Sequence, residues 1–144
     1  MQTAVVERVL VEAKIENLTD LRDTDRGLLP RDQVRTTIVP GALVDTGSTT
    51  LALPTRLIHQ LGLQKAYEKR ARTSAGTQQI SIFDAVRLTL LDRFCTVDVM
   101  EVPDEAPVLI GPIPLEMLDL VVDSQGRRLI GNPAHNGEHV LELY

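Results

Sequence analysis

The sequence predicts an all-β domain, a closed barrel or sandwich with one or two short helices. Apolar and polar residues alternate along several segments, which is the spacing of half-buried strands. Turn residues recur about every ten positions, as they do in all-β folds. The 144 residues, 43% of them hydrophobic, suit one globular domain that spans residues 1–144.

The first half of the chain supplies three expected strands and a loop. Residues 9–15 alternate between apolar and polar positions, so they predict a strand with one buried face. Residues 19–33 are rich in Asp and Arg and predict a solvated connection. Residues 34–39 and 42–44 predict two short strands, because the Pro40-Gly pair between them is typical of a turn.

The second half continues the pattern after one short helix. Residues 54–63 predict this helix, because Pro54 suits a first turn and Gly62 suits a helix end. A helical turn or two is also expected at residues 114–120. The remaining apolar runs predict strands at residues 69–73, 79–91, 94–102, 108–110, 120–122, 128–130 and 139–144.

Composition excludes several classes of function. The formal charge is −5 and aromatic residues make up only 3%, so neither nucleic acid nor a membrane surface is an expected partner. Cys95 is the one cysteine, which excludes an internal disulfide framework and a cysteine-based zinc cluster. No apolar run is long enough to span a bilayer, and no secretory leader is recognisable, so a cytoplasmic protein is expected.

The histidines and the cysteine suggest little chemistry of their own. His59, His135 and His139 are spaced too irregularly for an obvious metal site, although the spacing of the last two leaves a metal site there as a minor alternative. Cys95 lies in an expected strand and is more consistent with a buried structural thiol than with a nucleophile. No metal and no cofactor is expected.

The strongest local signal is the segment Leu-Val-Asp-Thr-Gly-Ser at residues 43–48. An apolar strand runs directly into Asp45, and Thr46 and Ser48 place hydroxyl groups beside its carboxylate. A carboxylate between apolar segments is partly desolvated and hydrogen-bonded, which is how proteins tune a pKa. The same residue types also form ordinary turns, so a structural role for Asp45 remains the alternative.

In this context the chain resembles the retroviral-type aspartic proteases, and most closely their soluble, non-viral, one-lobed members. The resemblance rests on residues 43–48, on the small-residue tip at residues 74–77, and on Leu-Ile-Gly at residues 109–111. The order and spacing of the three elements match the family over roughly residues 5–130. The resemblance implies an acid-protease-like all-β fold with one lobe per chain.

The resemblance also implies a catalytic pair of carboxylates. The chain has one Asp-Thr-Gly segment; a second acidic turn at residues 123–126 has an extra residue and is read as a hairpin turn. A homodimer with Asp45 of each chain at its axis would complete the pair. Thr46 would hold the two loops together across the axis, and Gly47 would expose its backbone to an extended polypeptide substrate.

Further residues carry over as expected substrate contacts. Ser48 would donate its hydroxyl to the carboxylate and shift the pH optimum toward acid. Leu109 is a candidate subsite wall, as are Leu53, Ile82 and Ile113, although core packing also explains these four. The closing tip over the substrate would comprise Ser74, Ala75, Gly76 and Thr77.

Two positions depart from the viral pattern. Pro112 follows the late glycine where viral members usually have Arg, and Thr49 replaces an acidic residue. The ion pair that braces the viral dimer therefore cannot form. This departure favours the alternative function, a catalytically silent dimeric β-domain that binds peptide or assembles a complex, whereas the intact Asp-Thr-Gly-Ser segment favours the enzyme.

Overall fold

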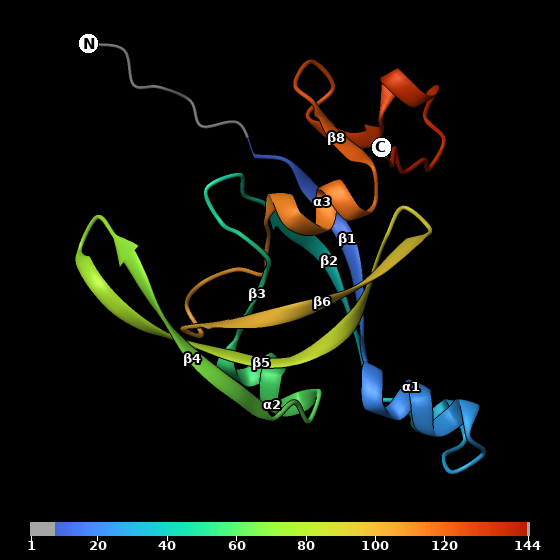
Figure 1. Cartoon of the computed structure of the whole chain (residues 1–144), viewed down its shortest axis with the longest axis vertical. Helices are drawn as coiled ribbons and strands as arrows, with labels where there is room; N and C mark the ends of the chain where they lie inside the picture. Colours follow the sequence, from blue (N-terminus) through green and yellow to red (C-terminus); the bar gives the residue numbers. More distant parts are fainter. Residues whose placement is uncertain (1–7, 144) are drawn as a thin grey trace.

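The computed structural model describes residues 8–143. Seven strands form one sheet in the order β1-β2-β7-β3-β6-β5-β4, and β1 also pairs with β5. This second pairing closes six of the strands into a ring and leaves β4 outside it, paired with β5 (Figure 1). The expected all-β fold with a closed sheet is confirmed.

The strands and helices follow one another with short connections. The strands of the large sheet are β1 (Leu10–Asn17), β2 (Thr36–Val44), β3 (Leu51–Pro54), β4 (Lys65–Thr73), β5 (Gly76–Leu90), β6 (Arg93–Val102) and β7 (Leu109–Ile110). The pair β8 (Leu120–Asp123) and β9 (Arg128–Gly131) forms a separate hairpin. The helices are α1 (Leu18–Asp25), α2 (Thr55–Gln60) and α3 (Pro112–Met117), with single turns η1 (Arg31–Gln33) and η2 (Pro133–His135).

The core lies inside the ring of strands. Alternate residues of β1, including Val11, Ala13 and Ile15, point inward, and the intervening residues are mostly exposed. The inner faces of β3, β5 and β6 meet them, and α2 and α3 close the ends with Ile58 and Leu115. The alternation read from the sequence therefore corresponds to the burial along these strands.

The segment at residues 19–33 was expected to be a loop, and this is wrong for its first part. Residues 18–25 form α1, which begins because the side chain of Asn17 accepts a hydrogen bond from the backbone N–H of Asp20. Asp20 is buried and binds the Arg35 guanidinium with both carboxylate oxygens, at 2.8 and 2.9 Å. The hydrogen bond with Arg35 lowers the pKa of Asp20. Asp20 of this segment thus joins the helix to Arg35, which lies outside it.

Two further strand predictions need correction. β2 is continuous through Pro40, because the register of its pairing with β1 shifts between Val11 and Ala13 and accommodates the proline there. The expected strand at residues 139–144 is absent as far as Leu143, where the described chain ends. Among the described residues, none of the helices combines the length and the apolar character needed to cross a membrane.

Candidate active site

Asp45 lies directly after β2, in the loop that leads to β3 (residues 45–50). β2 and β7 run parallel, and the backbone N–H of Asp45 donates to the carbonyl of Ile110 at 2.9 Å. The carboxylate oxygen Oδ1 accepts a hydrogen bond from the N–H of Gly47 at 2.9 Å. The N–H of Ser48 donates to the Asp45 carbonyl at 3.1 Å, which closes a tight turn. The carboxylate is therefore oriented by the backbone of its own loop.

The other side of this loop rests on Gly111. Its N–H donates to the carbonyl of Thr50 at 2.8 Å, and the N–H of Ile113 donates to the carbonyl of Thr49 at 3.1 Å. A Cβ atom at position 111 would lie 2.4 Å from the carbonyl carbon and oxygen of Thr49. Only glycine fits this contact, so the two motifs recognised in the sequence are one structural unit.

The neighbours of Asp45 have different surroundings. Thr46 and Gly47 are exposed in the single chain. The hydroxyl of Ser48 is buried, and nothing in residues 8–143 forms a hydrogen bond with it. The expected donation from Ser48 to Asp45 is thus not formed within one chain. The exposed part of the loop is the part that the homodimer hypothesis assigns to the axis.

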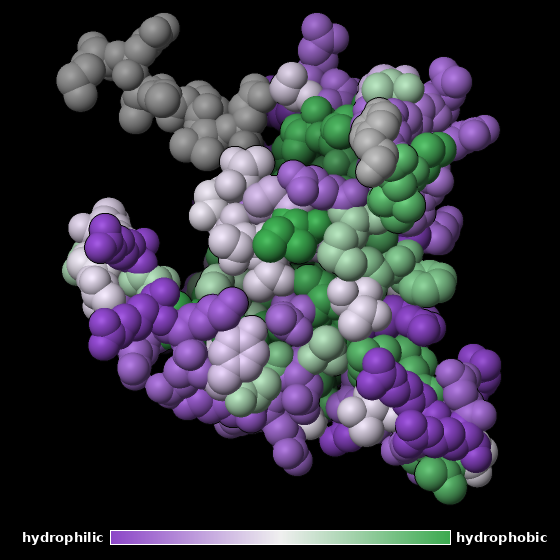
Figure 2. Space-filling model, viewed as in Figure 1, coloured by the Kyte–Doolittle hydropathy of each residue, from purple (hydrophilic) through white to green (hydrophobic). Residues whose placement is uncertain are grey.

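A cavity of about 540 Å³ lies between the β4–β5 hairpin, β6 and α3. Its floor is largely apolar, with Ile80, Ile82 and Met100, and Ile113 and Met117 of α3 lie opposite the hairpin. Figure 2 shows the corresponding hollow between the hairpin arm and the body of the molecule. The other residues that line it are Thr49, Thr50, Tyr67, Lys69, Arg70, Ala71, Thr96, Val97 and Asp98. Because Thr49 and Thr50 end the Asp45 loop, the cavity adjoins the candidate active site.

The predicted substrate contacts divide into three groups. Ile82 and Ile113 line the cavity, whereas Leu109 is half-buried in β7 and does not, and Leu53 is fully buried in the core. The tip residues Ser74, Ala75, Gly76 and Thr77 are exposed at the end of the hairpin arm (Figure 1). Within the described residues, no hydrogen bond joins this tip to the Asp45 loop. Gly76 has φ +106°, a conformation that glycine adopts without strain.

Several cavity residues were missed by sequence reasoning. Tyr67 pairs with Ile82, and Lys69 pairs with Ile80, so these four side chains share one face of the hairpin. The alternation of residues along β4 could have indicated which of its side chains share a face. Assigning that face to the cavity requires the register between β4 and β5. The first part of β4, residues 65–68, was not predicted as a strand, because it contains charged side chains.

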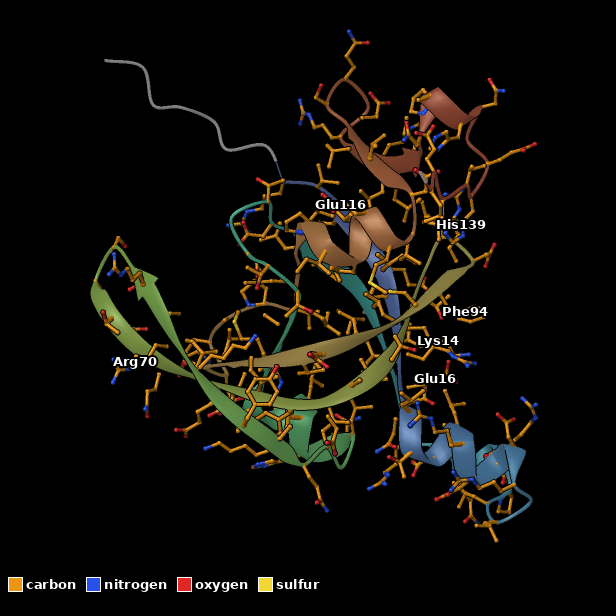
Figure 3. All side chains as sticks on the ribbon, in the orientation of Figure 1. Lys14, Glu16, Arg70, Phe94, Glu116 and His139 are labelled. Carbon is orange, nitrogen blue, oxygen red and sulfur yellow. The ribbon has the colours of Figure 1, made fainter. Side chains whose placement is uncertain are left out.

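Beyond the cavity, a cluster of polar groups fastens the C-terminal segment to the end of α3. His135 places Nδ1 2.6 Å from an Asp119 carboxylate oxygen and Nε2 2.9 Å from a Glu142 oxygen. Asp119 also accepts hydrogen bonds from Asn132 and from the N–H of Val140, both at 3.1 Å. Neighbouring His139, labelled in Figure 3, contacts the carbonyl of Met117.

These contacts shift the pKa values of Asp119 and His135. Burial raises the pKa of Asp119, but the hydrogen bonds from His135, Asn132 and the Val140 backbone outweigh it and lower the pKa to about 2. The hydrogen bonds to Asp119 and Glu142 raise the pKa of His135. Two carboxylates facing both ring nitrogens favour the imidazolium form, in which both nitrogens donate.

The other residues that the sequence offered as possible functional sites have surroundings that fit a structural role. Within residues 8–143, no group of three or more His, Cys, Asp or Glu side chains is arranged to hold a metal ion. Asp123 accepts a hydrogen bond from the N–H of Gln125 in the β8–β9 turn, as expected of a hairpin. Cys95 is buried, and burial raises the pKa of its thiol to about 11.

The closed sheet, the Asp-Thr-Gly loop and its Leu-Ile-Gly support define a β-domain of the acid-protease type. A family model described as aspartyl protease matches residues 36–114, which is more than half of the chain. The chain therefore belongs to the retropepsin-like aspartyl protease family. The match includes the Asp45 loop, the hairpin and Gly111. A comparison with curated proteins gave no significant match.

Proposed function

We propose that the protein is an aspartic endopeptidase whose catalytic pair is Asp45 from each of two chains. The observation that supports this most directly is the Asp45 loop, which is held by β7 and Gly111 and is exposed at Thr46 and Gly47. One chain has one such loop, so the pair requires a homodimer. Residues 1–144 would act as one domain in each protomer.

The proposed mechanism follows from the proximity of two carboxyl groups. Two carboxylates about 3 Å apart repel one another, so the pair shares one proton over the pH range between its two apparent pKa values. The ionised Asp45 removes a proton from a water molecule, and the protonated Asp45 of the other chain donates to the peptide carbonyl. The tetrahedral intermediate then collapses without a covalent acyl-enzyme. The two pKa values belong to the pair and not to either residue.

The substrate is proposed to bind as an extended strand. The apolar cavity beside the loop supplies room for side chains, with Ile82 and Ile113 on opposite sides. Ser74, Ala75, Gly76 and Thr77 would close over the backbone, and Ser48 would contact the substrate from the Asp45 loop. Leu109 does not line the cavity, so its proposed role is to support that loop through the pairing of β7 with β2. An extended backbone places alternate side chains in pockets, which suits a cleft between a hairpin and a helix.

A second candidate is a catalytically silent dimer that binds peptide. The absence of the viral ion pair at Thr49 and Pro112 favours it, because the dimer lacks that brace. The hydrogen bonds that hold the loop here are backbone hydrogen bonds within one chain. A weak dimer would leave the two carboxylates apart at low concentration.

Cleavage of a pooled peptide library between about pH 4 and pH 7 tests the proposal. Wild type and Asp45→Asn are compared at high protein concentration, with sedimentation measured on the same samples. Cleavage by wild type alone supports the endopeptidase. A dimer that leaves every peptide intact, with or without the substitution, supports the binding domain instead.

A further inference from the structure

The β4–β5 hairpin carries a charge opposite to that of the chain. Residues 65–80 contain four basic side chains and one acidic side chain, so their formal charge is +3, whereas the whole chain carries −5. Figure 3 places Arg70 on the hairpin arm that projects from the body of the molecule. This arm forms one wall of the cavity beside Asp45.

Most of the positive charge on the arm is uncompensated. Lys65 forms a salt bridge with Glu68 and is thereby neutralised. Lys69, Arg70 and Arg72 form no salt bridge within the described part of the chain, and all three are exposed. Three cations thus remain available to a ligand lying along the arm.

Lys69 is the cation that faces the cavity. It lies opposite Ile80 in the antiparallel register, and Ile80 lines the cavity floor. Its ammonium group lies 5.4 Å from the centre of the Tyr67 ring, a cation–π contact that holds the charge over the cavity wall. Arg70 also lines the cavity.

The β6 side of the cavity carries the opposite charge. Asp98 of β6 lines the cavity, and its carboxylate forms no salt bridge or hydrogen bond with the residues that the structure describes. Its backbone carbonyl accepts a hydrogen bond from Thr50, which fixes β6 against the Asp45 loop. The cavity is therefore an apolar floor between a basic hairpin wall and an acidic strand wall.

We infer that Lys69 and Arg70 are specificity-determining residues. They select polypeptide segments that place an acidic side chain on the hairpin side of the cavity. This inference rests on the proposed function, because it assigns a substrate class to the same cleft. A glutamate or aspartate placed there meets Lys69 and lies away from Asp98. An apolar neighbour in the same segment occupies the floor formed by Ile80, Ile82 and Met100.

Binding to the full-length Asp45→Asn protein tests the inference separately from turnover. The probes are fluorescent peptides of about ten residues with a central leucine–phenylalanine pair and glutamate, glutamine or lysine near either end. For exposed charge pairs, the glutamate peptides are expected to bind about two- to fivefold more tightly than the glutamine peptides at low salt. Raising the salt concentration to about 0.5 M is expected to remove most of this preference.

Two double variants with the same net charge provide the matched comparison. Lys69→Glu with Arg70→Glu is expected to reverse the preference, so that lysine peptides bind best. Arg22→Glu with Arg31→Glu, at exposed positions of α1 and η1, is expected to leave the preference unchanged. Circular dichroism on each variant checks that it is folded.

The inference is overturned by equal binding of the three peptide types, by no binding of any of them, or by a preference that survives reversal at positions 69 and 70. Stronger competition from a single-stranded oligonucleotide than from the glutamate peptide also overturns it. A charge preference without cleavage by wild type supports the inference and contradicts the proposed endopeptidase activity, so the two failures are distinguishable.

Discussion

Replacing Gly111 by alanine should disrupt the site more severely than its small size suggests. The backbone at this position is already compatible with alanine, since φ is −83°. The obstacle is contact, because the new Cβ would lie 2.4 Å from the Thr49 carbonyl atoms and 2.8 Å from the Thr50 carbonyl oxygen. These are backbone atoms of the Asp45 loop and cannot turn aside as a side chain would.

The expected loss of stability follows from two contributions. Overpacking that moves backbone costs about 1–3 kcal/mol. Displacing the loop also weakens the hydrogen bonds from Gly111 to Thr50 and from Ile113 to Thr49, each worth about 1 kcal/mol. The free energy of unfolding should therefore fall by about 2–5 kcal/mol. At about 2–4 °C per kcal/mol, the Tm should fall by roughly 4–20 °C.

Gly41→Ala is the matched control. A Cβ at position 41 in β2 would meet only Leu10 Cδ1, at an ordinary contact distance of 3.7 Å. The Tm of Gly41→Ala is expected to change little, because alanine fits at this position and restricts the conformations of the unfolded chain. Urea denaturation and thermal melting of both variants measure the difference. Equal Tm values for the two variants would refute the argument that Gly111 supports the loop by close contact.

Three further substitutions and one labelling experiment test other parts of the structure. His135→Gln should lower the free energy of unfolding most between about pH 4 and pH 6. The raised pKa of His135 stabilises the fold below the ordinary His value of 6.5, and this stabilisation is lost as the pH rises; the stabilisation from the lowered pKa of Asp119 is lost as the pH falls toward 2. A loss of stability that does not vary with pH would contradict this. Asp20→Asn should destabilise at neutral pH, and the difference from wild type should shrink in acid, because a lowered Asp pKa stabilises only the ionised form; urea titrations at several pH values show whether it does. Ser48→Ala should raise the free energy of unfolding of the single chain by up to about 1 kcal/mol by removing an unpaired buried hydroxyl; denaturation at low protein concentration measures this, and a decrease would contradict it. Cys95 should resist a thiol reagent near pH 8 until the chain unfolds, because burial raises the pKa of its thiol to about 11; rapid labelling of folded protein would be the contrary result.

The sequence predicted the features that depend on local spacing. Alternation identified β1, apolar runs between turn residues identified β5 and β6, and Gly62 marked the end of α2, where its φ is +67°. The Asp45 loop and Gly111 were recognised as separate motifs of the resemblance, and the structure shows that they meet in backbone contact.

Features that depend on distant partners were not predictable in this way. α1 is stabilised in part by Arg35, which lies outside the helix, so its own charged sequence suggested a loop. β2 passes through Pro40 only because β1 shifts register beside it. Lys69 reaches the cavity through the register of β4 with β5, which no short-range pattern in the sequence reveals.

The dependence of the Asp45 loop on β7 has a consequence for the order in which the protein gains function. The loop and its support are far apart in the chain, and contacts of this kind form late because a long loop must first close. During synthesis, a chain that has not yet reached Gly111 lacks the carbonyl of Ile110 and the contact with Thr49. Such a nascent chain carries the aspartate in a loop that is not yet held against β7. The arrangement thus delays the final placement of the Asp45 loop until the β-domain is nearly complete.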